Sequence, residues 1–177
     1  LGDSSLIINW LNGRWRCKYK VYDERVAILH RSIERLTSNF AARPREDHCD
    51  WGRHIFRELN ADADSLASRH AWTYKEHTRR HDFACYRIFF DGSCTPTGSG
   101  GGWVLWGTEL CHNDGLGDWT KVAELSFPLN RGATVTAAEL EACVWGVSYL
   151  VARLQGERAV DENVKEWRDL DTSKFVI

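Results

Sequence analysis

The sequence lacks several features that would point at once to a class of protein. Its 23 lysines and arginines nearly balance its 25 aspartates and glutamates, and the formal net charge is −2. The chain therefore has no general positive charge of the kind that many nucleic-acid-binding proteins carry. No signal peptide, membrane-spanning run, low-complexity segment or internal repeat is visible. Any contact with nucleic acid must depend on a local patch, and we expect no membrane partner.

The six cysteines form no metal-binding pattern. The sequence contains no CxxC pair and no Cys/His spacing typical of a zinc site. Cys85 and Cys143 lie inside apolar runs, where a free cysteine behaves as a small hydrophobic side chain. These observations favour a reducing, intracellular setting, and they leave the compartment within the cell open.

The composition is that of a soluble globular protein. With 43% hydrophobic and 27% charged residues, the 177-residue chain is long enough for one domain with a proper core. The apolar patterns predict helices over 5–12, 22–40, 59–72 and 136–154, strands over 52–59, 84–93, 103–110, 121–129 and 173–177, and a glycine-rich turn over 95–102. The charged segment 73–82 has no apolar periodicity and is predicted to be a linker.

Four carboxylates stand in distinctive local contexts. Asp91 ends an apolar strand and precedes a Gly-Ser pair, and Glu139 lies in the first turn of a helix. Asp3 lies in a Gly-Asp-Ser turn, and Asp64 follows Asp62 near a helix start. Each residue alone has an ordinary interpretation as a turn or helix-start residue. Together they predict a cation site, because a buried carboxylate needs charge compensation and Mg²⁺ prefers hard oxygen ligands.

Four segments carry a resemblance to a known family. YRIFFDGSCTPTGSGGGWVLWG, TAAELEACVWGV, GDSSLIINWLNG and FRELNADADSLASRHA each resemble one segment of the ribonuclease H family, in its plant and retroelement type. The resemblance implies an α/β fold with a five-stranded mixed sheet of order 3-2-1-4-5 and helices on both faces. It also implies a metal-dependent endonuclease that hydrolyses the RNA strand of an RNA/DNA hybrid.

The resemblance assigns a role to each carboxylate. Two Mg²⁺ ions, or Mn²⁺ in their place, would lie about 3.5–4 Å apart. Asp91 would bridge both ions, Glu139 and Asp3 would hold the ion at the leaving group, and Asp64 would hold the ion at the attacking water. Asp62 competes with Asp64 for the fourth position, and the sequence alone does not choose between them.

The order of the segments differs from that of the family. Residues 1–72 correspond to its C-terminal half and 83–177 to its N-terminal half, with 73–82 as the linker within one domain. Joining SKFVI at the end to LGDSS at the start gives one continuous strand that leads into Asp3. The pattern indicates a circularly permuted fold. A tandem array and an exchange of halves between two copies are the alternatives that stay open.

The predicted substrate contacts depart from the family pattern. Gly92 and Ser93 follow the first aspartate, but Thr134 and Thr136 stand where the family often has asparagines. The loop before Asp64 also lacks the histidine that helps product release in some members. The threonines at 134 and 136, together with the strand divided between the two ends of the sequence, motivate an alternative, a weak or inactive nucleic-acid-binding or scaffold module of the same fold.

A basic and aromatic cluster is the remaining candidate for substrate binding. Arg14, Arg16 and Trp15, together with nearby lysines, are candidates to contact phosphates, although a solvated surface is the more common explanation of such a cluster. The glycines at 98–102 serve a hairpin rather than a phosphate-binding loop, because no Lys-Ser/Thr pair follows them.

Overall fold

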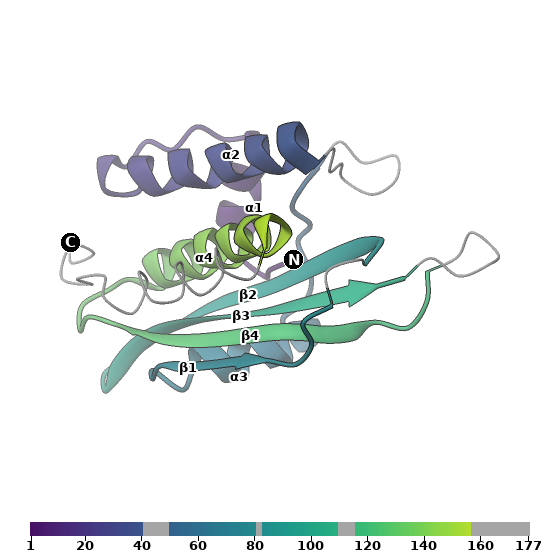
Figure 1. Ribbon diagram of the computed structural model, residues 1–177. Helices are drawn as coiled ribbons and strands as arrows, with labels where there is room; N and C mark the ends of the chain where they lie inside the picture. Colours follow the sequence, from purple (N-terminus) through teal and green to yellow (C-terminus); the bar gives the residue numbers. More distant parts are fainter. Residues whose placement is uncertain (41–49, 81–82, 110–115, 157–177) are drawn as a thin grey trace.

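A four-stranded antiparallel sheet forms the centre of the protein (Figure 1). The computed structural model describes residues 1–40, 50–80, 83–109 and 116–156. The strands are β1 (Thr73–Glu76), β2 (Cys85–Thr95), β3 (Gly98–Thr108) and β4 (Thr120–Leu129), and their order across the sheet is β1-β4-β3-β2.

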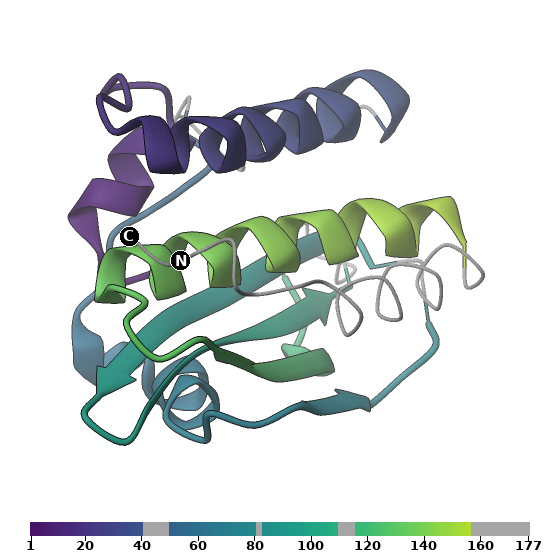
Figure 2. The same ribbon diagram turned by 90° about the vertical axis from the view of Figure 1, so that its left-hand side faces the viewer.

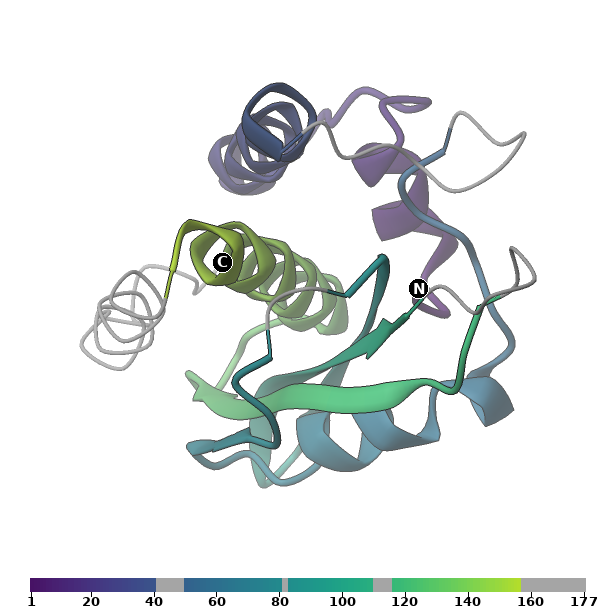
Figure 3. The same cartoon turned by 45° about the vertical axis from the view of Figure 1, so that its right-hand side comes forward.

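Helices cover both faces of this sheet. They are α1 (Ser5–Leu11), α2 (Lys20–Phe40), α3 (Ala61–Ala67) and α4 (Val135–Gln155), and a short 3₁₀ turn, η1 (Arg57–Leu59), precedes α3. α4 lies on one face with α2 stacked above it, and α3 lies on the opposite face, as two perpendicular views agree (Figures 1 and 2). α1, near the start of the chain, lies on the same side of the sheet as α2 and α4 (Figure 3). The predicted helices at 5–12, 22–40 and 136–154 are confirmed within a few residues.

α4 is the central helix of the core. It is buried on most of its circumference because it lies between the sheet and α2. Trp145 on α4 and Trp103 on β3 are both almost completely buried, and the Trp103 and Tyr149 rings approach to 4.7 Å between centroids. α4 is long and apolar enough to cross a membrane, but 72% of its most apolar window is buried within the protein. Its apolar character is therefore that of a core helix.

The prediction of a five-stranded mixed sheet is wrong. Among the described residues the sheet has four strands, and every pairing between them is antiparallel. At the outer edge of β2, the first residues of the chain make individual contacts and do not form a paired strand. The Leu1 nitrogen donates to the Ile88 carbonyl at 2.6 Å, and the Phe90 nitrogen donates to the Leu1 carbonyl at 3.1 Å. One isolated parallel bridge then joins Gly2 to His54.

The strand predicted over 52–59 is also wrong. Apart from the bridge at His54, the segment is irregular and ends in the 3₁₀ turn η1. Most of its side chains are exposed, so no alternating buried face exists to fix a strand register.

The glycine-rich run lies in a strand rather than in a turn. β2 and β3 pair from Thr95 and Gly98 onward, so the hairpin loop consists of residues 96–97. At two glycines of β3 there is no room for a side chain, because neighbouring residues approach the backbone closely. A Cβ on Gly101 would lie 2.3 Å from the Phe127 ring, and one on Gly102 would lie 2.5 Å from Leu66.

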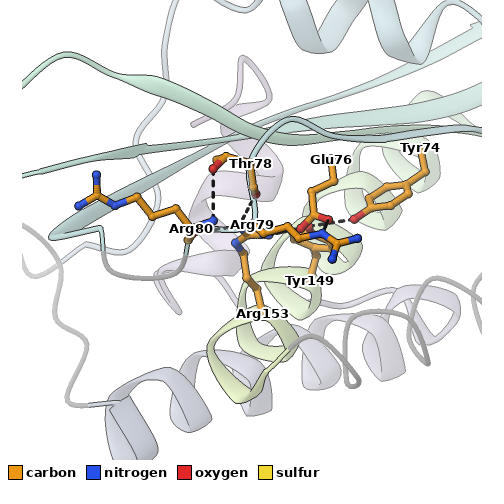
Figure 4. A network of polar contacts seen from close by, with 7 residues as sticks. All are labelled: Tyr74, Glu76, Thr78, Arg79, Arg80, Tyr149 and Arg153. Atoms are coloured by element: carbon orange, nitrogen blue, oxygen red, sulfur yellow. Dashed lines mark hydrogen bonds and ion pairs between the residues drawn. The ribbon is translucent and has the colours of Figure 1, made fainter.

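The segment predicted as a linker is tied to the core. Residues 73–76 form the edge strand β1, which pairs with β4. Arg153 of α4 has no exposed side-chain surface and forms an ion pair with Glu76 at 2.7 Å. The same guanidinium donates to the carbonyls of Thr78 at 2.6 Å and Arg80 at 2.8 Å (Figure 4). β1 has only four residues, which alternate between exposed and half-buried, and so short a pattern does not predict a strand from the sequence.

The predicted strand over 173–177 lies outside the described residues. The proposed joining of SKFVI to LGDSS, and with it the permuted arrangement, therefore stays a prediction.

Candidate metal centre

Three of the four predicted carboxylates meet at one place. Asp3, Asp91 and Glu139 each present an oxygen, and these oxygens lie within 4.8 Å of one another. Asp3 comes from the turn before α1, Asp91 from β2 and Glu139 from α4. The three residues meet within a single chain, without a second copy.

Asp91 lies inside β2 rather than at its end. The apolar part of the strand stops at Phe90, but pairing with β3 continues to Thr95. Asp91 is only 5% exposed. The Gly92 nitrogen donates to its Oδ1 atom at 2.8 Å.

Gly92 allows β2 and α4 to approach each other closely. A Cβ at this position would lie 2.3 Å from the backbone nitrogen of Glu139 and 2.7 Å from the Ala138 side chain. Real Cβ atoms do not show such contacts, so a larger residue would push α4 away from the strand. The glycine predicted to bind substrate therefore also sets the spacing between Asp91 and Glu139.

Asp3 is positioned by the segment that precedes α3. The Asn60 side chain is 1% exposed, and its Nδ2 donates to the Phe90 carbonyl at 2.9 Å and to Asp3 Oδ1 at 3.4 Å. The Ser4 side chain next to Asp3 forms a hydrogen bond with Glu139. The Gly-Asp-Ser turn is thus joined to β2, α3 and α4.

The geometry distinguishes between Asp62 and Asp64. Asp64 is within hydrogen-bonding reach of Asp91, and its Oδ1 accepts from Arg57 at 2.9 Å. Asp62 instead forms an ion pair with Lys121 at 3.0 Å. Asp64 is therefore the fourth carboxylate beside the cluster.

The cluster makes ionisation of its members unfavourable. Burial, together with the neighbouring charges of Asp3 and Asp64, raises the pKa of Asp91 to about 7. Burial and the charge of Asp3 also raise the pKa of Glu139, against the opposing hydrogen bond from Ser4. Carboxylates that are held together although this disfavours their ionisation supply the oxygen ligands that a divalent cation uses. The residues present therefore fit Mg²⁺ or Mn²⁺.

The predicted contacts at the start of α4 are partly used within the protein. Thr134 is the N-cap residue of α4, and its Oγ1 accepts from the Ala137 nitrogen at 3.1 Å. The same hydroxyl lies 2.8 Å from the Tyr22 hydroxyl of α2. Thr136, the second residue of α4, is half-buried. Because α4 begins at Val135, one residue earlier than predicted, Glu139 lies just beyond the first turn rather than within it.

Ser93 lies two residues beyond Asp91 on β2 and is half-buried. Its Oγ atom lies 3.4 Å from Nε2 of His70, so the Ser93 hydroxyl contacts the segment that follows α3.

The basic and aromatic cluster lies on the surface between α1 and α2. Arg14, Arg16 and Trp15 are exposed, with Trp15 at 53%. Arg14 forms an ion pair with Asp50. At the start of α2, Arg25 pairs with the buried Glu141 of α4. This pair ties α2 to the helix that carries Glu139.

Comparisons with known proteins add no assignment to this geometry. No protein-family model matches the chain, and neither the curated proteins nor the solved structures give a significant match.

Two residues of the centre were missed in the sequence. Asn60 precedes α3 without making a side-chain cap bond, and instead it holds Asp3. Ser4 was considered only as part of a turn. The available signal was an asparagine just before the Ala-Asp-Ala-Asp run, and its burial explains why its amide must find polar partners.

Proposed function

We propose that the protein is a metal-dependent endonuclease of ribonuclease H type that hydrolyses the RNA strand of RNA/DNA hybrids. The observation that carries the proposal is the meeting of Asp3, Asp91 and Glu139 within 4.8 Å, with Asp64 against Asp91. These residues come from four segments that were singled out for their resemblance to that family. Acidic residues that cluster by chance are not expected to lie in four segments that each resemble the same family.

Each carboxylate has a role in this proposal. Asp91, Asp3 and Glu139 would hold one divalent ion, and Asp91 with Asp64 would hold a second. When bound, such ions activate a water molecule and stabilise the leaving oxygen in phosphodiester hydrolysis. Asn60 keeps Asp3 directed toward the cluster through its hydrogen bond to Oδ1. Gly92 keeps the helix that carries Glu139 against the strand that carries Asp91.

The charge balance and the surface residues of the chain are compatible with a hybrid substrate. RNA-containing duplexes are recognised mainly through shape, 2′-hydroxyls and phosphates, which needs neither a high net charge nor a base-reading motif. Thr136 at the start of α4 and the exposed residues Arg16 and Trp15 offer hydroxyl, cationic and aromatic groups. A net charge of −2 is compatible with such a local arrangement.

A cleavage assay tests the proposal. An end-labelled RNA/DNA hybrid is incubated with the protein in Mg²⁺ and, separately, in chelator. The expected result is internal cleavage of the RNA strand only in Mg²⁺, and its loss in Asp91→Asn. Asp23→Asn, an exposed aspartate on α2, is the matched control and should cleave as the wild type does. Undiminished cleavage by Asp91→Asn would remove this site from the reaction.

One observation favours a second candidate, a hybrid-binding module that does not cleave. Thr134 is occupied by its hydrogen bonds to Ala137 and Tyr22, where the family often presents asparagines to the substrate. That candidate predicts retention of the hybrid in a mobility-shift gel and no products in Mg²⁺ or Mn²⁺. Metal-dependent products would exclude it.

A further inference from the structure

The α3 face of the sheet is covered at one end and open at the other. Pairing places Asp91, Gly102 and Ser126 side by side across β2, β3 and β4. α3 packs on this row, because Ser126 Oγ donates to the Leu66 carbonyl at 2.7 Å and Gly102 lies directly beneath Leu66. α3 is only seven residues long, so it does not extend over the rest of the face.

The open part of this face carries aromatic rings and cations. Phe89 lies two residues before Asp91 on β2, a separation of about 7 Å, and Arg87 lies two residues before Phe89. Pairing places Arg87 beside Trp106 and Trp106 beside Lys121. The Arg87 guanidinium lies 4.1 Å from the ring centroid of Trp119, and Lys121 Nζ lies 5.2 Å from that of Trp106.

These rings line a cavity beside the carboxylate centre. Its volume is about 330 Å³, and its walls include Phe89, Trp106, Trp119 and Arg87. The opposite wall is the segment from Leu59 to Asp62. Sites for small molecules and for single groups of larger ligands have volumes of roughly 300–1,000 Å³. Asn60 belongs both to this wall and to the carboxylate centre, so the cavity and the centre share a boundary.

We propose that this cavity binds an unpaired nucleotide of the nucleic-acid strand that occupies the carboxylate centre. The inference rests on the proposed function and extends it to a substrate class, hybrids with a single-stranded overhang. Three aromatic rings offer stacking surfaces that accept any base, because every base has a π-face. Arg87, an exposed residue that lines the cavity, supplies positive charge for the attached phosphate.

The shape of the site favours an unpaired base over a duplex. A paired base is stacked between its neighbours and cannot enter a cavity with aromatic walls, whereas a base in an overhang can leave the stack at little cost. The short separation between Asp91 and Phe89 along one strand places the cavity beside the nucleotides that flank the cleaved bond.

Binding measurements in chelator test the proposal without cleavage. Fluorescence anisotropy compares a blunt hybrid with the same hybrid carrying a short overhang, of DNA or of RNA, at each end in turn. For the wild type, an overhang at one end should tighten binding about fivefold or more, the least that stacking of one base on an aromatic ring gives. The DNA and RNA arms identify which strand supplies the nucleotide.

Substitutions then assign the effect to the cavity. Trp119→Ala should abolish the advantage of the overhang, and Trp119→Phe should retain most of it. Arg87→Gln, on the exposed surface of β2, should reduce it and provides a second test if Trp119→Ala does not fold. Phe56→Ala is the matched control, because it removes an exposed aromatic side chain outside the cavity and should leave the ratio of the two affinities unchanged.

The outcomes separate this inference from the proposed function. Equal affinities for blunt and overhung hybrids, or an advantage that survives in Trp119→Ala, would overturn the cavity assignment. Free nucleoside monophosphate bound at the cavity with no effect of an overhang would overturn it as well. Cleavage of the blunt hybrid in Mg²⁺ is measured in parallel, and its absence counts against the nuclease assignment alone.

Discussion

Asp91 is the residue of the site at which burial and neighbouring carboxylates most clearly oppose ionisation. It is almost completely buried, it faces Asp3 and Asp64, and the nearest compensating donor is the backbone nitrogen of Gly92. The raised pKa of about 7 means that the folded chain, without metal, prefers to keep a proton on this carboxyl. A bound divalent cation reverses that preference, because metal ligands must be deprotonated.

The same pKa predicts how stability depends on pH in chelator. Between pH 3.8 and about 7, the unfolded chain has released the Asp91 proton and the folded chain still holds it. The free energy of unfolding contributed by this residue therefore falls as the pH rises through that window, and below it the contribution is fully present. Asp91→Asn should show a flatter profile in urea unfolding across the same range. Profiles of equal slope would contradict the buried, clustered environment of Asp91.

Asn60 should act on metal binding through Asp3. Asn60→Ala removes the donor to Asp3 Oδ1 and to the Phe90 carbonyl. Loss of such an outer hydrogen bond typically weakens metal binding about 10- to 100-fold. Calorimetric titration with Mn²⁺ measures the change, and Ser65→Ala, an exposed position on α3, is the control. An unchanged Mn²⁺ affinity in folded Asn60→Ala would show that Asp3 needs no such support.

At the scale of elements, β1 and the chain after it depend on α4. Arg153 gathers Glu76 and two backbone carbonyls around one buried guanidinium, and Tyr149 accepts from it at 3.3 Å (Figure 4). Removal of one partner from a buried ion pair is costly because the remaining polar groups lose their compensation.

Arg153→Met should therefore destabilise the fold by about 3 kcal/mol, toward the lower end of the usual range because Glu76 is 27% exposed. Urea unfolding measures the loss, and hydrogen exchange at His77 should become faster, since its nitrogen is bonded to Val122 in the same segment. Arg79→Met is the matched control, with a side chain 78% exposed and only a 3.8 Å contact to Glu76. Equal losses in both variants would contradict the anchoring role of Arg153.

Elements with strong periodicity could be predicted from the sequence, and others could not. The apolar spacing of α2 and α4 and the β-prone run of β2 correspond to helices and a strand. The run 52–59 has strand-like composition, but its exposed side chains leave only one bridge at His54. The glycines of β3 resemble a turn, yet they serve close packing against Phe127 and Leu66, which only the folded neighbours reveal.

At the scale of the whole molecule, the candidate centre could be predicted better than the sheet around it. Each carboxylate was recognisable from a few flanking residues, because a metal-binding group needs a specific turn or helix to present it. The sheet depends on pairings between distant segments, and those of Leu1 and Gly2 amount to single contacts. The choice of Asp64 over Asp62 likewise depended on Lys121, which lies far away in sequence.

The central claim is that Asp3, Asp91 and Glu139 form one divalent-cation site. Calorimetric titration of the wild type with Mn²⁺, beside Asp3→Asn, Asp91→Asn and Glu139→Gln, tests it most directly. The account predicts saturable binding in the wild type and a loss of about tenfold or more in each variant, with every variant still folded by circular dichroism. No saturable binding in the wild type, or wild-type affinity in Asp3→Asn, would contradict it.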